Sequence, residues 1–156
     1  MSKYSYAVGF YVISIVACAV EQKKPPADSD RAVAEAYVAA WNRHDTVAID
    51  TLLAPDAIHE DFAANFRGKG PKAVVAFMRG IQSTEPDYKW TVTDGIEDGK
   101  FVALEWTWTG TYTGPDPAGK QVTNRRTSGK GASFVEVDDG RIKRFSDYYD
   151  LSSFFR

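Results

Sequence analysis

The sequence contains very little cysteine and histidine. Cys18 is the only cysteine, and His44 and His59 are the only histidines among 156 residues. One cysteine excludes a disulfide within the chain and a metal cage built from cysteines, and two histidines exclude a three-histidine metal site. An excess of positive charge is also missing, because 19 Lys and Arg residues are balanced by 21 Asp and Glu residues. We therefore expect no metal site and no nucleic-acid partner.

Apolar and aromatic residues are plentiful by contrast. Hydrophobic residues make up 44% of the chain, which includes nine Phe, eight Tyr and four Trp. This length and composition are typical of one globular domain that buries a substantial core. Any chemistry then rests on carboxylates, tyrosines, basic side chains and a histidine, and we expect no cofactor.

The first 30 residues differ from the rest of the chain. Residues 4–20 contain no charged side chain, and an apolar stretch of eleven residues covers positions 7–17. That length is typical of the hydrophobic region of a signal peptide and is shorter than the roughly 20 residues of a membrane-spanning helix. The stretch ends in the letters IVAC, at residues 15–18, which resemble the lipobox of bacterial lipoproteins.

This resemblance implies a cleaved leader and a lipid anchor. Residues 1–17 are then a signal peptide, Cys18 carries the acyl chains, and residues 18–29 form a polar tether that contains two adjacent prolines. The protein is then held on a membrane face of the cell envelope, either periplasmic or at the outer membrane. An uncleaved membrane anchor and a wrongly assigned start are the alternatives.

Residues 30–156 have the pattern of an α+β domain. Apolar residues recur at helical spacing in three segments: residues 31–41 after the N-cap candidates Ser29 and Asp30, a short segment between Asp45 and Pro55, and a segment that begins at Gly70. After residue 86 the apolar period changes to two, which predicts antiparallel strands joined by turns. The predicted strands are 57–62, one containing 88–92, 100–113, 121–137 and 141–150.

This order of elements resembles the nuclear transport factor 2-like superfamily, and within it the SnoaL-like polyketide cyclases. The similar stretches are AAWNRHDTVAIDTLLAPDAIHEDF, FRGKGPKAVVAFM, DGIEDGKFVALEWTWTGTYTG and VEVDDGRIKRFSDYYDLSSFFR, which together span most of residues 30–156. The resemblance implies a cone, in which three N-terminal helices cover a curved antiparallel sheet. It also implies a homodimer across the convex face of the sheet. The superfamily includes isomerases, cyclases and non-catalytic binding proteins.

Strand alternation predicts which side chains face the interior of this cone. His59 and Asp61 share one face of the strand 57–62, and Phe145, Asp147 and Tyr149 share one face of the last strand. A face that carries Phe and Tyr is expected to line the cavity. A carboxylate among aromatic rings is poorly solvated, so the pKa of Asp147 is expected to rise toward that of a general acid or base.

The strand 100–113 supplies the expected ligand-contacting wall. Leu104, Trp106 and Trp108 alternate onto one face, together with Val102. With Phe145 and Tyr149 on the neighbouring strand, these side chains indicate an apolar ligand.

Two further acids are candidates through resemblance. Asp61 is similar to the general base of the ketosteroid isomerases, and Tyr37, which precedes it by 24 residues, is similar to their oxyanion donor. The second oxyanion donor of those enzymes, a buried acid on a later strand, is missing, because the strand 121–137 contains no Asp and its one carboxylate, Glu136, lies at the turn end. Asp150 is similar in position to the acid/base residue of the SnoaL-like cyclases. Asp147 and Asp150 thus compete for one role.

Two functions remain open from the sequence. The first is cofactor-free acid–base catalysis on a small apolar carbonyl compound, carried out by Asp61 with Asp147 or Asp150, Tyr37 and His59. The second is a non-catalytic module that holds an apolar ligand at the cell envelope, where the lipid on Cys18 attaches it to the membrane.

Overall fold

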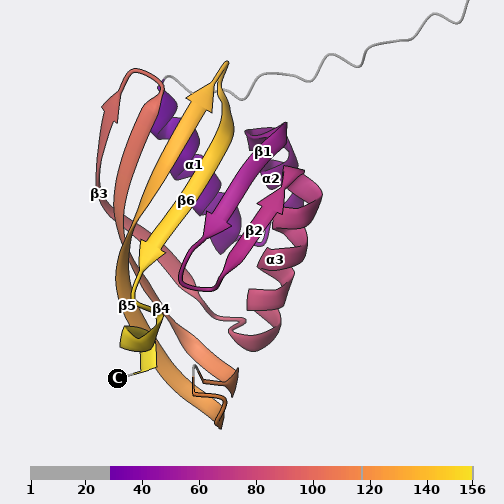
Figure 1. The fold of residues 1–156 in the computed structure, drawn as a ribbon, viewed down its shortest axis with the longest axis vertical. Helices are drawn as coiled ribbons and strands as arrows, with labels where there is room; N and C mark the ends of the chain where they lie inside the picture. The colour runs from indigo at the N-terminus through magenta and orange to yellow at the C-terminus, as the bar shows by residue number, and fades with distance from the viewer. Residues whose placement is uncertain (1–28, 117, 156) are drawn as a thin grey trace, which may run out of the picture.

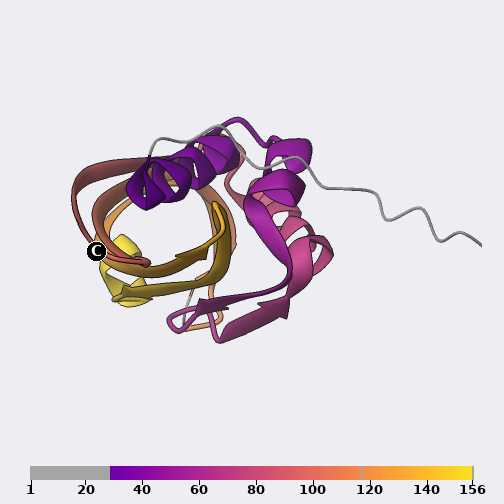
Figure 2. The same ribbon diagram turned by 90° about the horizontal axis from the view of Figure 1, so that it is seen from above.

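Six strands form one curved sheet, and helices close its concave side (Figures 1 and 2). This computed structural model describes residues 29–116 and 118–155. The predicted leader, Cys18 and nearly all of the tether lie outside these residues, so the lipid anchor remains a prediction. Along the chain, the elements are α1 (Asp30–Asn42), α2 (Thr46–Leu52), β1 (Leu53–Asp61), β2 (Phe66–Lys69), α3 (Gly70–Thr84), β3 (Lys89–Asp98), β4 (Phe101–Pro115), β5 (Gln121–Asp138), β6 (Arg141–Tyr149) and the 3-10 helix η1 (Leu151–Phe155).

The strand order is β2-β1-β6-β5-β4-β3. Strands β3 to β6 form the antiparallel meander that the sequence predicted, and β2 is antiparallel to β1. The pairing of β1 with β6 is parallel. The α+β fold class and the curved sheet with covering helices are confirmed, and one parallel pair is added to the sheet.

The structure differs from the sequence-based boundaries mainly around β1. This strand begins at Leu53, four residues before the predicted start, and Pro55 lies inside it. Pro55 is exposed and falls in the stretch where the register between β1 and β6 shifts, which is a position that tolerates a residue without a backbone N–H. Strand β2 was not predicted, because four residues are too few to show an alternating pattern.

Helix α1 supplies much of the core, as its apolar spacing predicted. The Ser29 side chain caps the helix by accepting a hydrogen bond from the backbone N–H of Ala32. Val33, Tyr37 and Trp41 recur on the face turned toward the sheet, and all three are buried. None of the helices in the described ranges is long and apolar enough to cross a membrane.

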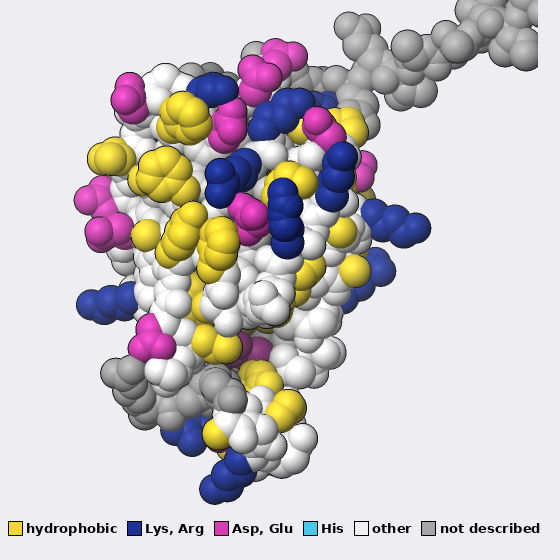
Figure 3. All heavy atoms as spheres, viewed as in Figure 1, with side chains coloured by type: hydrophobic (Ala, Val, Ile, Leu, Met, Phe, Trp, Pro, Cys, Tyr) yellow, Lys and Arg dark blue, Asp and Glu magenta, His cyan; other side chains and the backbone are white. Residues whose placement is uncertain are grey.

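The sheet has a buried and an exposed face. On β4, Val102, Leu104, Trp106 and Trp108 are buried on the concave face, as predicted from their alternation. The opposite, convex face carries large exposed hydrophobic side chains, and Figure 3 shows hydrophobic side chains gathered there over the sheet. We call the following residues the convex-face patch: Phe62, Ile96, Phe101, Phe134 and Tyr148.

Glycine on β5 makes room for the aromatic side chains of the concave face. Gly131 pairs with Trp106 of β4, and a Cβ atom at Gly131 would overlap the Trp106 ring. The Trp106 indole N–H donates a hydrogen bond to Ser133 Oγ at 2.8 Å, so the ring is not free to move aside. Space for this tryptophan therefore depends on the missing side chain at Gly131.

We expect Gly131→Ala to lower the free energy of unfolding by about 1–3 kcal/mol, because the added methyl group overpacks the concave face. Gly80→Ala is the matched control, since Gly80 is exposed within α3 and no atom lies within 4 Å of the added Cβ position. That change is expected to raise the free energy of unfolding by about 0.5–1 kcal/mol. Urea denaturation measures both, and wild-type stability in Gly131→Ala would contradict the steric argument.

Candidate functional site

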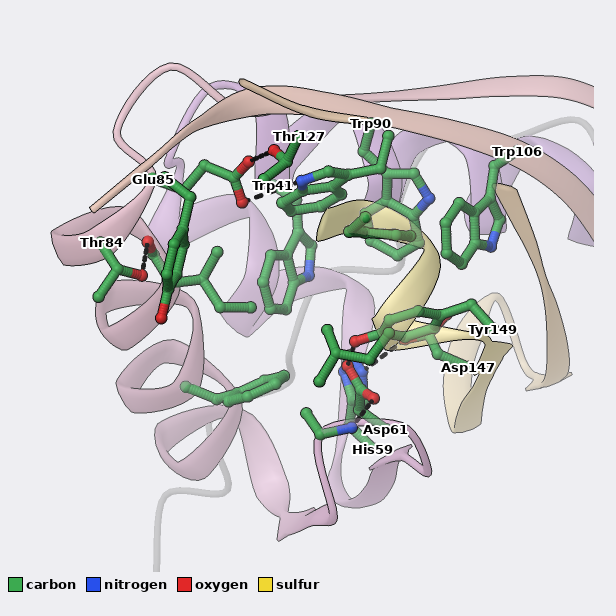
Figure 4. Close-up of a pocket in the computed structure, with 17 residues that line it drawn as sticks. Trp41, His59, Asp61, Thr84, Glu85, Trp90, Trp106, Thr127, Asp147 and Tyr149 are labelled. Atoms are coloured by element: carbon green, nitrogen blue, oxygen red, sulfur yellow. Dashed lines mark hydrogen bonds and ion pairs between the residues drawn. The ribbon is translucent and has the colours of Figure 1, made fainter. Parts of the chain in front are cut away.

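A cavity of about 160 Å³ lies on the concave side of the sheet, between the strands, the helices α1 and α3, and η1 (Figure 4). An apolar cavity of about 150 Å³ is large enough to hold benzene. The apolar and aromatic lining residues are Trp41, Ala64, Phe77, Ile81, Trp90, Trp106, Trp108, Tyr112, Tyr149, Leu151 and Phe154, and the polar ones are His59, Asp61, Thr84, Glu85, Thr127 and Asp147. The cavity is thus a mostly aromatic chamber with a few polar groups.

One end of the cavity is built from β1 and β6, and we call it the β1–β6 end. His59 and Asp61 lie on the inward face of β1, while Asp147 and Tyr149 lie on the inward face of β6. The parallel register aligns Asp61 with Asp147 across the two strands. The sequence alternation correctly put His59 and Asp61 on one face and turned Asp147 and Tyr149 inward, although it did not indicate the pairing.

Asp61 is a buried carboxylic acid at the cavity wall. Its Oδ1 accepts a hydrogen bond from the backbone N–H of Ala64 at 2.8 Å, and its Oδ2 accepts one from the Tyr149 hydroxyl at 2.9 Å. Burial raises the pKa of Asp61, and the nearby charge of Asp147 adds to this effect, whereas the Ala64 and Tyr149 hydrogen bonds oppose it. No Lys or Arg in the described ranges forms an ion pair with Asp61.

A chain of hydrogen bonds holds His59 and Asp147 in place. The Tyr37 hydroxyl is 2.7 Å from His59 Nδ1, and His59 Nε2 is 3.0 Å from Asp147 Oδ2. The Ser133 hydroxyl donates to Asp147 Oδ1 at 2.5 Å and accepts from the Trp106 indole N–H. Both ring nitrogens of His59 and both carboxyl oxygens of Asp147 are thus engaged. The chain fixes the orientation of both side chains.

A second acid, Glu85, lies across the cavity, and we call its surroundings the Glu85 end. Glu85 follows the last residue of α3 and is buried. Its Oε1 accepts a hydrogen bond from the Thr127 hydroxyl, and its Oε2 accepts one from the Trp108 indole N–H at 3.1 Å. Burial raises the pKa of Glu85, the two hydrogen bonds oppose this, and the charge of Asp87 adds to it.

Sequence reasoning missed Glu85, although a signal for it existed. Phe77, Ile81 and Glu85 are spaced four residues apart, so Glu85 continues the inward stripe of α3 by one turn. A carboxylate at the end of an apolar helix stripe is unusual and indicates a buried acid. Room for it comes from β4, because a Cβ atom at Gly110 would overlap the Glu85 carboxyl group.

Several expected site residues do not line the cavity. Leu104 and Phe145 are core residues behind the lining, and Tyr37 is buried with its hydroxyl directed to His59. The Tyr37 hydroxyl therefore contacts His59, whereas it was expected to contact a substrate. Asp150 is exposed, and its Oδ1 accepts hydrogen bonds from the backbone and hydroxyl of Ser152 at the start of η1. Asp147 is therefore the inward-facing acid of the competing pair, because side-chain alternation in β6 turns it inward.

Metal ligation has little support in this arrangement. No group of three or more His, Cys, Asp or Glu residues that could hold a metal ion occurs in residues 29–116 and 118–155.

Trp106, Trp108 and Tyr149, which were expected to contact a ligand, do line the cavity. The chemistry available in the described cavity is therefore that of carboxyl, imidazole, hydroxyl and indole groups.

Comparison with known families and structures gives consistent matches. The sequence model of the SnoaL-like domain matches residues 34–145. No curated protein sequence matches the chain. Among solved structures, TsrD from Streptomyces laurentii is similar with a TM-score of 0.67 and 26% identity, covering 79% of this chain and 89% of that one.

Two further structures share the fold at lower identity. IdmH from Streptomyces antibioticus, provisionally named a polyketide cyclase, gives a TM-score of 0.71 at 21% identity and covers 81% of this chain and 96% of its own. A hypothetical protein from Catenulispora acidiphila has a ketosteroid isomerase-like fold and was solved in complex with trimethylamine. It gives a TM-score of 0.68 at 23% identity and covers 78% of this chain and 88% of its own.

The raised pKa of Asp61 predicts a pH-dependent cost to folding. Below about pH 4, the usual pKa of an Asp side chain, the acid is protonated in both states and no cost arises. As the pH rises further, the unfolded chain ionises first, so the free energy of unfolding falls until the pH passes the pKa of the folded state. We therefore expect Asp61→Asn to gain stability relative to the wild type as the pH rises from about 4.

Urea denaturation of both proteins across this pH range measures the difference. Asp150→Asn is the matched control, because Asp150 is exposed. A stability difference between wild type and Asp61→Asn that does not change with pH would show that Asp61 has an ordinary pKa.

Proposed function

Since the chain belongs to the SnoaL-like family, we propose that it transfers a proton within a small apolar carbonyl compound, without a cofactor, and that Asp61 is the base. The observation that carries this proposal is the position of Asp61. Its carboxyl group is buried at the wall of an aromatic cavity, and burial raises its pKa above the ordinary value of an Asp side chain, which makes the carboxylate a stronger base.

The proposed step moves one proton and one electron pair. The Asp61 carboxylate removes a proton from the carbon next to the carbonyl, and the electron pair of that C–H bond forms the C=C bond of an enolate as the carbonyl π electrons move to oxygen. Asp61 then returns the proton, either to the same carbon or to another carbon of the enolate. The Tyr149 hydroxyl, which donates to Asp61 Oδ2, holds the carboxyl group in one orientation through both steps.

The enolate oxygen needs a hydrogen-bond donor, and the Trp90 indole is the candidate. Its Nε1 atom is buried and has no hydrogen-bond partner in the described part of the chain, and Trp90 lines the cavity. A buried N–H without a partner is costly, so a carbonyl oxygen placed there would be favoured. The Trp90 indole replaces Tyr37 in the proposed role, because the Tyr37 hydroxyl is engaged by His59.

The second candidate function is non-catalytic binding of an apolar ligand. It is favoured by the position of Tyr37, since the donor expected by resemblance to the isomerases is not in the cavity lining. With the lipid anchor predicted at Cys18, such a module would hold its ligand at the cell envelope. The size of the cavity limits the enclosed part of either ligand to about that of benzene.

Proton exchange distinguishes the two functions. We expect the wild type to accelerate exchange of the protons next to the carbonyl of cyclohexanone or cyclohex-2-enone in D2O, measured by ¹H NMR. Asp61→Asn is expected to lower the enzymatic rate at least about 100-fold, because general-base catalysis contributes ~10²–10⁴-fold. Asp150→Asn, the exposed control, is expected to keep the wild-type rate.

Three outcomes are informative in this experiment. Saturable binding of the ketone without exchange would favour the binding module over the enzyme. Equal exchange by wild type and Asp61→Asn would show that another group is the base. Loss of exchange in Asp150→Asn would return the role to the position indicated by family resemblance.

We also propose that the chain forms a homodimer through the convex-face patch. The dimer is supported by the exposure of two side chains of this patch, Ile96 and Phe134, which are 72% and 56% accessible. Both flank Ala103, which pairs with Ile96 on one side and Phe134 on the other, so the three form a continuous apolar row across β3, β4 and β5. Contiguous exposed apolar surface of this kind is typical of an interface.

Sedimentation velocity across a range of protein concentrations tests the dimer. We expect Phe134→Lys combined with Ile96→Lys to convert the dimer to monomer. The twofold interface would bury these lysine charges and bring those of one copy close to those of the other. Val47→Lys is the control, since Val47 is 74% accessible but lies on α2. A wild-type chain that is monomeric at every concentration would exclude the dimer.

A further inference from the structure

The charged groups of the cavity are all of one sign. Asp61, Glu85 and Asp147 line it, while none of the lining residues in the described ranges is a Lys or Arg. An anionic ligand would therefore meet carboxylates without a balancing cation, at a high cost in a poorly solvated chamber. The ligand is then neutral or positively charged.

The two ends of the cavity differ in how their acids can be balanced. Asp147 bonds to His59, whose imidazole can accept a proton and become positive. The partners of Glu85 are the Thr127 hydroxyl and the Trp108 indole, neither of which can carry a positive charge. Asp87 adds further negative potential around Glu85. The Glu85 end is therefore the place where a cation from outside has most to gain.

Aromatic rings line the cavity between its two ends. Figure 4 shows Glu85 and Thr127 on one side of the cavity, His59, Asp61 and Tyr149 on the other, and Trp41 between them. The Trp108 indole directs its N–H edge at Glu85, to which it donates a hydrogen bond. Indole faces attract organic cations, and a methylated ammonium ion gives up its hydration more easily than a small inorganic cation, so such a pocket is selective for alkylammonium groups.

We propose that the Glu85 end of the cavity is a binding subsite for a small alkylammonium group. Its carboxylate, its uncharged partners and the surrounding indole rings form the recognition elements. Taken together with the proposed function, on which this extension rests, the subsite narrows the substrate from a wholly apolar carbonyl compound to a small amino-carbonyl compound. Its acidic C–H bond then lies at Asp61 and its ammonium group at Glu85.

The experiment compares a cation with a neutral molecule of similar size. Tetramethylammonium chloride and tert-butanol are titrated into the protein, with ionic strength held constant by NaCl, and binding is followed by ligand-observed ¹H NMR. Tetramethylammonium keeps its charge at every pH, so the measured preference reports on the protein. We expect the wild type to bind tetramethylammonium at least tenfold more tightly than tert-butanol.

Matched variants identify the acid responsible. Glu85→Gln keeps an oxygen that can accept from Thr127 and is expected to reduce the preference at least tenfold, whereas Glu85→Asp is expected to retain part of it. Asp150→Asn, which changes an exposed acid outside the cavity lining, is expected to keep the preference within about twofold, and Asp61→Asn is measured beside it. Thermal unfolding of each variant verifies that it is folded before its binding is compared.

Failure of this inference is separable from failure of the proposed function. Equal binding of the two probes by the wild type, or a preference that survives in folded Glu85→Gln, overturns the ammonium subsite even if proton exchange by Asp61 is intact. A preference that is lost in Asp61→Asn but kept in Glu85→Gln also overturns it, by moving the cation to the other end.

Discussion

The parallel pairing of β1 with β6 is the constraint on which the cavity depends. This register aligns Asp61 with Asp147 and places His59 beside Phe145 on the concave face. Because side chains alternate along each strand, one register brings three polar groups to one end of an otherwise aromatic chamber. A shift of one residue in either strand would turn its acid to the convex face and leave the chamber without it.

Burying these polar groups is tolerated because nearly all of them are hydrogen-bonded. His59 and Asp147 lie in a chain that runs from Tyr37 to Trp106 through Ser133. Glu85 is held by a hydroxyl and an indole. The indole nitrogen of Trp90 remains without a partner in the described region, and Trp90 is one of the residues that line the cavity. Unsatisfied donors of this kind are rare in proteins, which makes this one informative about where a ligand oxygen binds.

The abundance of aromatic residues has a structural explanation in the chamber and the sheet. Glycine leaves room for two of the large rings, at Gly129 for Phe154 and at Gly131 for Trp106, and Gly110 leaves room for the Glu85 carboxyl group. The same rings exclude water from the acids, which is why burial is the main cause of the raised pKa of both Asp61 and Glu85. Packing and acid–base behaviour are therefore two consequences of the same residues.

The sequence by itself determined the helices, the meander and the inward faces of β4 and β6. The reason is that α1, β4 and β6 carry periodic apolar patterns that depend only on local geometry, and these patterns correctly turned Trp106, Asp147 and Tyr149 inward. Only the tertiary structure decided which of these groups meet. The contact of His59 with Asp147 spans 88 residues, and that of Glu85 with Thr127 spans 42. Such contacts arise from strand register and helix packing, which no local pattern encodes, so Tyr37 proved to lie behind His59 and Glu85 emerged as an acid of the cavity.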